Sequence, residues 1–170
     1  MKTKFILFAL IIPLIYLFIC SFNSGNQNLN GEELYRNCAG CHQPDGKGIP
    51  GFYPPHVGHV PELLRTRGGR QFVTHVVLFG LSGVICVNNK EYGKTVAMPA
   101  WDTVLTDAQI SSVLNYICFT LGSNKIKLPK GFKPFTSEEI KKDRSHFLTA
   151  VQVYTERNKI YGEPCLKKKI

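Results

Sequence analysis

Methionine and charge are both scarce in the middle of this 170-residue chain. Beyond the initiator, Met98 is the only methionine, so a role that needs a thioether falls to it alone. Residues 31–128 carry nine Lys or Arg against seven Asp or Glu, whereas residues 129–170 carry ten against five. The net charge of +9 therefore belongs to the ends of the chain. Because nucleic-acid binding needs clustered positive charge, the near-neutral middle argues against nucleic acid as a partner.

The sequence also lacks a second pair of closely spaced cysteines that would complete a structural zinc site with Cys38 and Cys41. Cys86 and Cys118 are too scattered to serve, and the α/β setting of a thioredoxin-like redox pair is missing. What is present is Cys-Ala-Gly-Cys-His, ending at His42, which is the attachment pattern of a c-type haem. Two thiols at this spacing can add to the two vinyl groups of one porphyrin, and the next histidine can bind its iron.

The N-terminus has two lysines followed by an uncharged, apolar run from Phe5 to Cys20. This order is typical of an export signal or membrane anchor, so we expect residues 1–22 to be that segment and residues 23–30 a polar linker. The remainder would then lie in the periplasm or on the outer side of the cytoplasmic membrane, tethered through the N-terminus. Cleavage, retention as an anchor and lipidation at Cys20 all remain open.

The periodicity of the remaining chain predicts helices joined by turns. Asn30 and Glu33 form a capping-box pattern before a short helix that ends in the Cys-His motif. The Gly- and Pro-rich segment 43–59 predicts a loop. Further expected elements are helices over 61–67, 70–79, 107–121 and 138–158, and a hairpin over 84–92.

These pieces together resemble a class I monohaem cytochrome c of the bacterial membrane-associated kind, over residues 31–123. The specific part of the resemblance is the Cys-His motif with Met98-Pro99 downstream. It implies a mostly α fold: a cytochrome c-like helical domain wrapped around one haem, with a small β-hairpin. Residues 124–170 would form a basic C-terminal extension with a helix. Supporting matches are Gly31, Tyr35, Gly46, Gly48, Phe52 to Pro55, Gly80 to Gly83, and Leu105 to Ile117.

The resemblance also implies a site. One haem c would be held covalently through Cys38 and Cys41, with His42 as the proximal iron ligand and Met98 as the distal one. The residues that would line the haem are Tyr53, Pro54, Pro55 and Trp101.

The other histidines depart from the family pattern or lie outside it. His56 stands where similar proteins commonly have leucine, and His59 stands where a small polar residue is usual. Either could reach a haem propionate, or could bind the iron in place of Met98 in a bis-His site. We expect His75 to be a structural histidine on a helix, and His146 has no evident role.

The implied function is electron transfer in a respiratory or dehydrogenase chain, without enzymatic activity of its own. The expected partners are redox proteins at the membrane: an oxidase, a reductase or a dehydrogenase. One alternative is a haem enzyme or sensor with an open or bis-His distal site. Another is a protein without haem in which Cys38 and Cys41 form a disulfide.

Cys86 and Cys118 do not belong to the haem pattern. Outside the cytoplasm, two spare cysteines favour a disulfide, which would tie the hairpin beside Met98 to the last helix of the domain. Closing a loop of about thirty residues would stabilise the fold by roughly 3 kcal/mol. The alternative is two buried free thiols, and Cys165 has no evident partner.

Overall fold

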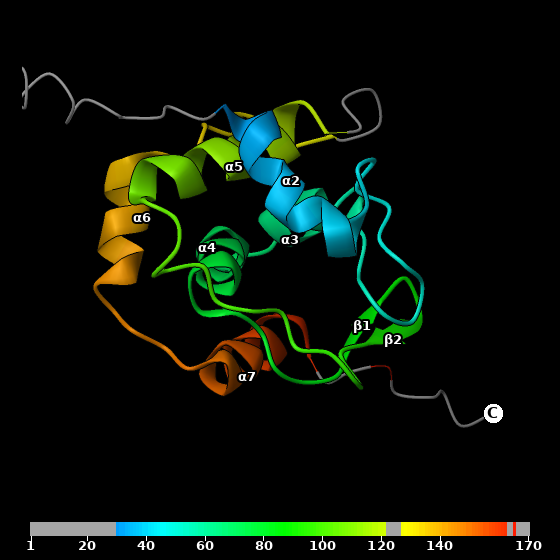
Figure 1. Cartoon of the computed structure of the whole chain (residues 1–170). Helices are drawn as coiled ribbons and strands as arrows, with labels where there is room; N and C mark the ends of the chain where they lie inside the picture. The colour runs from blue at the N-terminus through cyan, green and yellow to red at the C-terminus, as the bar shows by residue number, and fades with distance from the viewer. Residues whose placement is uncertain (1–29, 122–126, 163–164, 166–170) are drawn as a thin grey trace, which may run out of the picture.

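A computed structural model describes residues 30–121, 127–162 and 165. Within them the fold is mostly helical with one two-stranded antiparallel sheet, as predicted (Figure 1). The expected signal segment at 1–22 and residues 23–29 of the expected linker lie outside the described residues. The elements are α2 (Gly31–His42), α3 (His59–Leu64), α4 (Gly69–Phe79), β1 (Ile85–Val87), β2 (Lys90–Tyr92), α5 (Asp107–Phe119), α6 (Ser137–Arg144) and α7 (Ala150–Tyr161).

Helices α2 and α5 pack against each other at very close range. The predicted capping box is present: Asn30 Oδ1 accepts the backbone N–H of Glu33, and the Glu33 carboxylate accepts that of Asn30. A Cβ added to Gly31 would lie 2.4 Å from the carbonyl oxygen of Ser112 on α5. Glycine therefore permits the contact, which orients the helix that carries the Cys-His motif.

The apolar face predicted for α5 is buried, with Ile110, Val113 and Leu114 each at most 1 % exposed. It packs against α2, α3 and α6, and α4 packs against α3 and α7. The hairpin pairs Ile85 with Tyr92 around a turn at Asn88 and Asn89, whose φ angles of 52° and 60° suit asparagine. The helices and the hairpin of the predicted domain thus form, but α3 begins two residues before the expected 61–67 and ends three residues earlier, and α5 ends at Phe119.

The single C-terminal helix expected over 138–158 is wrong: α6 and α7 are separate helices. Thr149 accepts the backbone N–H of Gln152, whose side chain accepts that of Thr149, so a new capping box begins α7. The two helices fold back along the domain, α6 beside α5 and α7 beside α4 (Figure 1). Arg144 Nε donates to Asp107 Oδ1 at 2.7 Å and so fixes the end of α6 to the start of α5.

Helix α7 also contacts the hairpin region and α3. A Cβ on Gly83 would lie 2.4 Å from the Tyr154 ring, so the ring lies flat against backbone. At the other end of α7, the Tyr161 hydroxyl donates to the Leu63 carbonyl at 3.0 Å. The extension is therefore an integral part of the fold.

The expected disulfide between Cys86 and Cys118 is also wrong, because Cys86 pairs with Cys165, with their Cα atoms 5.0 Å apart. Ile85 and Val87 face the core, so the alternation of the strand turns Cys86 away from it and toward the tail. Cys118 is a free thiol, 3 % exposed, and burial raises its pKa to about 12.

Cys165→Ser should lower the free energy of unfolding by about 2–4 kcal/mol, because the disulfide closes a loop across 79 sequence positions. Denaturant unfolding before and after a thiol reductant, with the oxidation state of any bound metal held constant, measures this. The matched control is Cys118→Ala, which should keep the response to the reductant. Equal stability of C165S and oxidised wild type would contradict the assignment.

Candidate functional site

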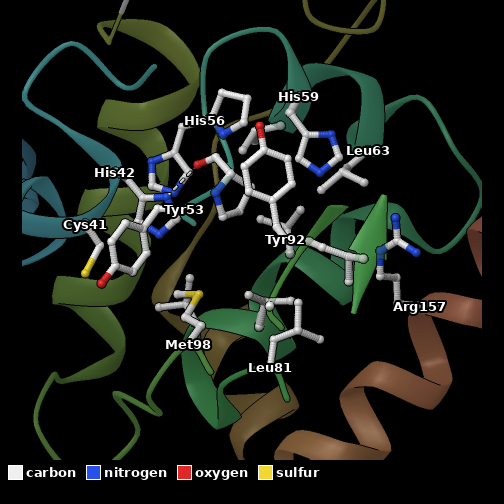
Figure 2. Close-up of a pocket in the computed structure, with 18 of the residues that line it drawn as sticks. Cys41, His42, Tyr53, His56, His59, Leu63, Leu81, Tyr92, Met98 and Arg157 are labelled. Carbon is white, nitrogen blue, oxygen red and sulfur yellow. Dashed lines mark hydrogen bonds between the residues drawn. The ribbon is translucent and has the colours of Figure 1, made fainter. Parts of the chain in front are cut away.

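A cavity of about 180 Å³ lies between α2, α3, α4, the hairpin and α7 (Figure 2). Three of the four residues predicted to hold the haem or its iron line it: Cys41, His42 and Met98. Most other lining side chains are aliphatic or aromatic, and Arg157 is the only Lys, Arg, Asp or Glu among them. The lining therefore suits an apolar ligand with one polar end.

His42 is the last residue of α2 and is 7 % exposed. Its Nδ1 lies 2.8 Å from the Pro54 carbonyl oxygen. Because a carbonyl can only accept, Nδ1 carries the proton and Nε2 keeps its lone pair, the state that a metal ligand requires. Burial lowers the pKa of His42, which keeps the ring neutral.

The loop after α2 brings Pro54 to His42. The Gly48 N–H donates to the His42 carbonyl at 2.9 Å, and Gly48 has φ +64°. A Cβ there would lie 2.3 Å from the Tyr53 carbonyl oxygen. Glycine thus provides both the left-handed turn and the space that let Tyr53 and Pro54 approach α2.

Cys38 and Cys41 are free, half-buried thiols on α2. Cys41 lines the cavity, whereas Cys38 packs against the core beside it. Burial, together with the nearby Cys41, raises the pKa of Cys38 to about 11. Both thiols are available for thioether formation, because neither forms a disulfide.

Met98 is held in place by backbone pairing with Leu81, through two hydrogen bonds of 3.0 Å each. Gly80, with φ +77°, lets the end of α4 approach the backbone of Met98, because a Cβ on Gly80 would lie 2.5 Å from the Met98 carbonyl oxygen. The thioether points into the cavity that His42 also lines (Figure 2). An imidazole nitrogen and a thioether sulfur are a donor pair known for haem iron, so the residues fit a bound haem.

The described residues contain no cluster of three or more His, Cys, Asp or Glu side chains that would hold a metal ion by themselves. A metal at His42 and Met98 would therefore need further donors, which the four ring nitrogens of a porphyrin provide. This agrees with the motif beside His42.

His56 lies beside His42 and does not face it across the cavity. The two rings stack with centroids 3.9 Å apart and an interplanar angle of 21°. The Tyr35 hydroxyl donates to the Gln43 carbonyl at 3.0 Å and lies 3.3 Å from His56 Nδ1. His56 thus packs against the ring of His42 in this geometry.

The remaining predicted residues separate into two groups. Tyr53, Pro54 and Pro55 line the cavity, whereas Trp101 packs half-buried against the core and is not among the lining residues. Contact between Trp101 and a haem therefore stays a prediction.

Two histidines take no part in the cavity. His75 Nδ1 lies 2.7 Å from Glu156 Oε2 between α4 and α7, which is the expected structural role. His146 is exposed in the turn after α6, and its ring nitrogen lies within hydrogen-bond distance of the Ser145 hydroxyl and the Lys142 carbonyl. Sequence analysis missed Arg157, because its position in a tail helix carries no motif that points to this cavity.

Gly48→Ala and Gly51→Ala form a matched pair that tests the loop. Both glycines have positive φ, but a Cβ on Gly51 meets nothing within 4 Å. We expect Gly51→Ala to cost about 1–2 kcal/mol of stability from the left-handed backbone alone. Gly48→Ala should cost about 1–3 kcal/mol more from the collision with the Tyr53 carbonyl. Equal losses of unfolding free energy in the two variants, measured by denaturant unfolding, would show that the close approach of the Tyr53 carbonyl to Gly48 does not affect stability.

Comparison with known proteins identifies the family of this chain. The cytochrome c family model matches residues 29–118. Cytochrome c-552 of Thermus thermophilus is 46 % identical over 131 residues, which is 77 % of this chain and 96 % of that protein. A second protein of the same name, from a particular strain of that species, is also 46 % identical over 131 residues, 85 % of its length. These alignments are longer than the span of the family model, so the likeness extends beyond it.

A more distant relative is the cytochrome c subunit of a quinone alcohol dehydrogenase from Gluconobacter oxydans. It is 33 % identical over 103 residues, which is 60 % of this chain but only 20 % of that protein. The family match covers more than half of the chain and includes the Cys-His motif. This chain therefore belongs to the cytochrome c family, whose members carry electrons on covalently bound haem c.

Proposed function

We propose that the protein is a one-electron carrier with a single haem c, held by Cys38 and Cys41 and ligated by His42 and Met98. The observation that carries this proposal is the orientation of His42: its Nδ1 is occupied by the Pro54 carbonyl, while the ring lines the same apolar cavity as the Met98 thioether. When bound, haem c supplies a reversible Fe(II)/Fe(III) couple.

Two features of the chain suit electron transfer better than catalysis. With His42 and Met98 both engaged, no position is left for a small substrate to bind, so the protein is proposed not to be an enzyme. The apolar walls keep water away, and a neutral thioether favours the less charged ferrous state, so both raise the reduction potential.

The rim of the cavity reaches the surface. Phe52 and Val96 line the cavity and are 56 % and 40 % exposed, so one edge of a bound haem would lie near solvent there. We place the exchange of electrons with a partner at this rim. The partners are proposed to be redox proteins at the membrane, in a respiratory or dehydrogenase chain, in line with the dehydrogenase subunit among the relatives.

The location is proposed from the N-terminal sequence. Residues 1–22 would export the protein and tether it outside the cytoplasmic membrane, with residues 23–30 as a linker. None of the helices in the described part of the chain combines the length and apolarity needed to cross a bilayer. The chain would then comprise a haem domain over 31–123 and the extension over 124–170.

Met98→Ala should retain the haem, lower the reduction potential and allow the reduced protein to bind carbon monoxide, because the variant removes the thioether. Absorption spectra and a potentiometric titration measure these changes. The matched control is Val96→Ala, which alters the same cavity wall but removes no donor atom. An unchanged potential in M98A, or carbon monoxide binding by the reduced wild type, would refute Met98 as ligand and favour an open-site haem protein.

The double variant Cys38→Ala, Cys41→Ala should lose covalent haem, because both thioether positions are gone. Haem staining after denaturing electrophoresis and the intact mass measure this. Cys118→Ala serves as the control and should keep the full haem mass. Wild-type protein with no added tetrapyrrole mass would overturn the proposed function itself.

A further inference from the structure

Arg157 is a buried cation with no carboxylate partner among the described residues. It lies on α7 in the C-terminal extension, is 4 % exposed and lines the cavity. Among the residues that the structure describes it forms no ion pair with a carboxylate. Because taking a guanidinium out of water is costly, a buried arginine normally has an anionic partner. The missing anion is therefore expected inside the cavity.

The hydrogen bonds of Arg157 show which of its nitrogens is left to bind such an anion. Nη2 donates to the Cys86 carbonyl at 2.9 Å, whereas Nη1 is buried and finds no hydrogen-bond partner in the part of the chain that the structure describes. His59 also lines the cavity, and its buried Nδ1 forms no hydrogen bond with any described residue. Its nearest carboxylate oxygen, on the exposed Glu62, is 3.7 Å away. Two unsatisfied polar nitrogens thus line one cavity.

These two residues lie at one end of the cavity. In Figure 2, His59 and Arg157 appear on one side, while Cys41 and His42 appear on the other. Burial lowers the pKa of His59 to about 4, and the charge of Arg157 contributes to this shift, so the two side chains are close enough to interact. His59 is consequently neutral at pH 7 and can donate from one ring nitrogen.

We propose that Arg157 and His59 bind a propionate carboxylate of the haem, so that the C-terminal extension completes the haem site. This inference rests on the proposed function, since it requires haem in the cavity. Haem is an apolar macrocycle with carboxylates on one edge, and the cavity is apolar apart from the ligand end and this cationic end. A planar guanidinium is well suited to a carboxylate because it offers paired N–H donors.

The extension holds Arg157 rigidly in position. The Arg157 guanidinium lies 5.8 Å from the Tyr161 ring centroid and donates a hydrogen bond to the Cys86 carbonyl on β1. The same Cys86 forms the disulfide to Cys165, which fixes the chain just after α7 to β1. The contacts of α7 described above therefore position the cation toward the cavity.

Arg157→Gln should lower the reduction potential, because loss of the cation leaves the propionate charge uncompensated and favours Fe(III). We expect at least a tenfold shift in the equilibrium constant for reduction by a common mediator, which is about 59 mV for one electron. Arg157→Lys should recover part of this shift, since it restores charge but not the planar donor pair. Resonance Raman spectra of the holoprotein should show a displaced propionate bending band in R157Q.

The matched control is Arg144→Gln, which removes a cation from the same extension. Arg144 bonds to Asp107 and to backbone carbonyls and does not line the cavity. The Arg144→Gln variant should be less stable than the wild type, but its reduction potential and propionate Raman band should be unchanged. If R157Q does not fold, His59→Phe provides the second test, because it should displace the same Raman band.

The outcomes separate this inference from the proposed function. A wild type that carries haem while R157Q or H59F leaves the potential and propionate band unchanged would overturn the propionate assignment alone. Equal shifts in R157Q and R144Q would also overturn it, since the effect would then reflect general loss of positive charge. Absence of haem from the wild type would instead overturn the proposed function.

Discussion

The hydrogen bond between His42 Nδ1 and the Pro54 carbonyl is the constraint on which the site depends. It decides the tautomer, the direction of the free nitrogen and the position of the loop in a single contact. Gly48 lets the chain turn back on α2 so that Pro54 can reach His42, and the close contact at Gly31 sets α2 against α5. The orientation of the His42 ring is thus linked to two glycines, Gly48 and Gly31, at positions where a side chain would collide with backbone.

The C-terminal extension changes how the cavity should be understood. Its helices do not simply follow the domain: α6 is bonded to the start of α5, and α7 covers α4 and contributes to the cavity wall. The disulfide from Cys86 to Cys165 links this wall to the hairpin. The part of the chain that the family model matches, residues 29–118, is therefore not the whole of the structure that encloses the cavity.

Features set by neighbouring residues could be predicted from the sequence. The capping boxes at Asn30 and Thr106, the Asn88-Asn89 turn and the Cys-His motif each depend on residues within a few positions. The break before α7 is equally local, since Thr149 and Gln152 form a capping box, but the apolar periodicity across it favours one continuous helix. The partner of Cys86 could not be predicted, because spacing does not reveal which face of a short strand meets a distant tail.

The role of Arg157 is a second feature that could not be predicted from the sequence. In sequence it is one of many basic residues in a basic tail, where a solvated position is the ordinary expectation. Only the fold reveals that this cation is buried against an apolar cavity and, unlike Arg144, has no carboxylate partner within residues 30–121, 127–162 and 165. A site that ends in an unpaired guanidinium is incomplete by itself, because its desolvation has no compensation within the described chain. A ligand that combines an anionic group with an apolar body would both cover the apolar walls and pair with the cation. Neither water in the cavity nor a simple anion would do both.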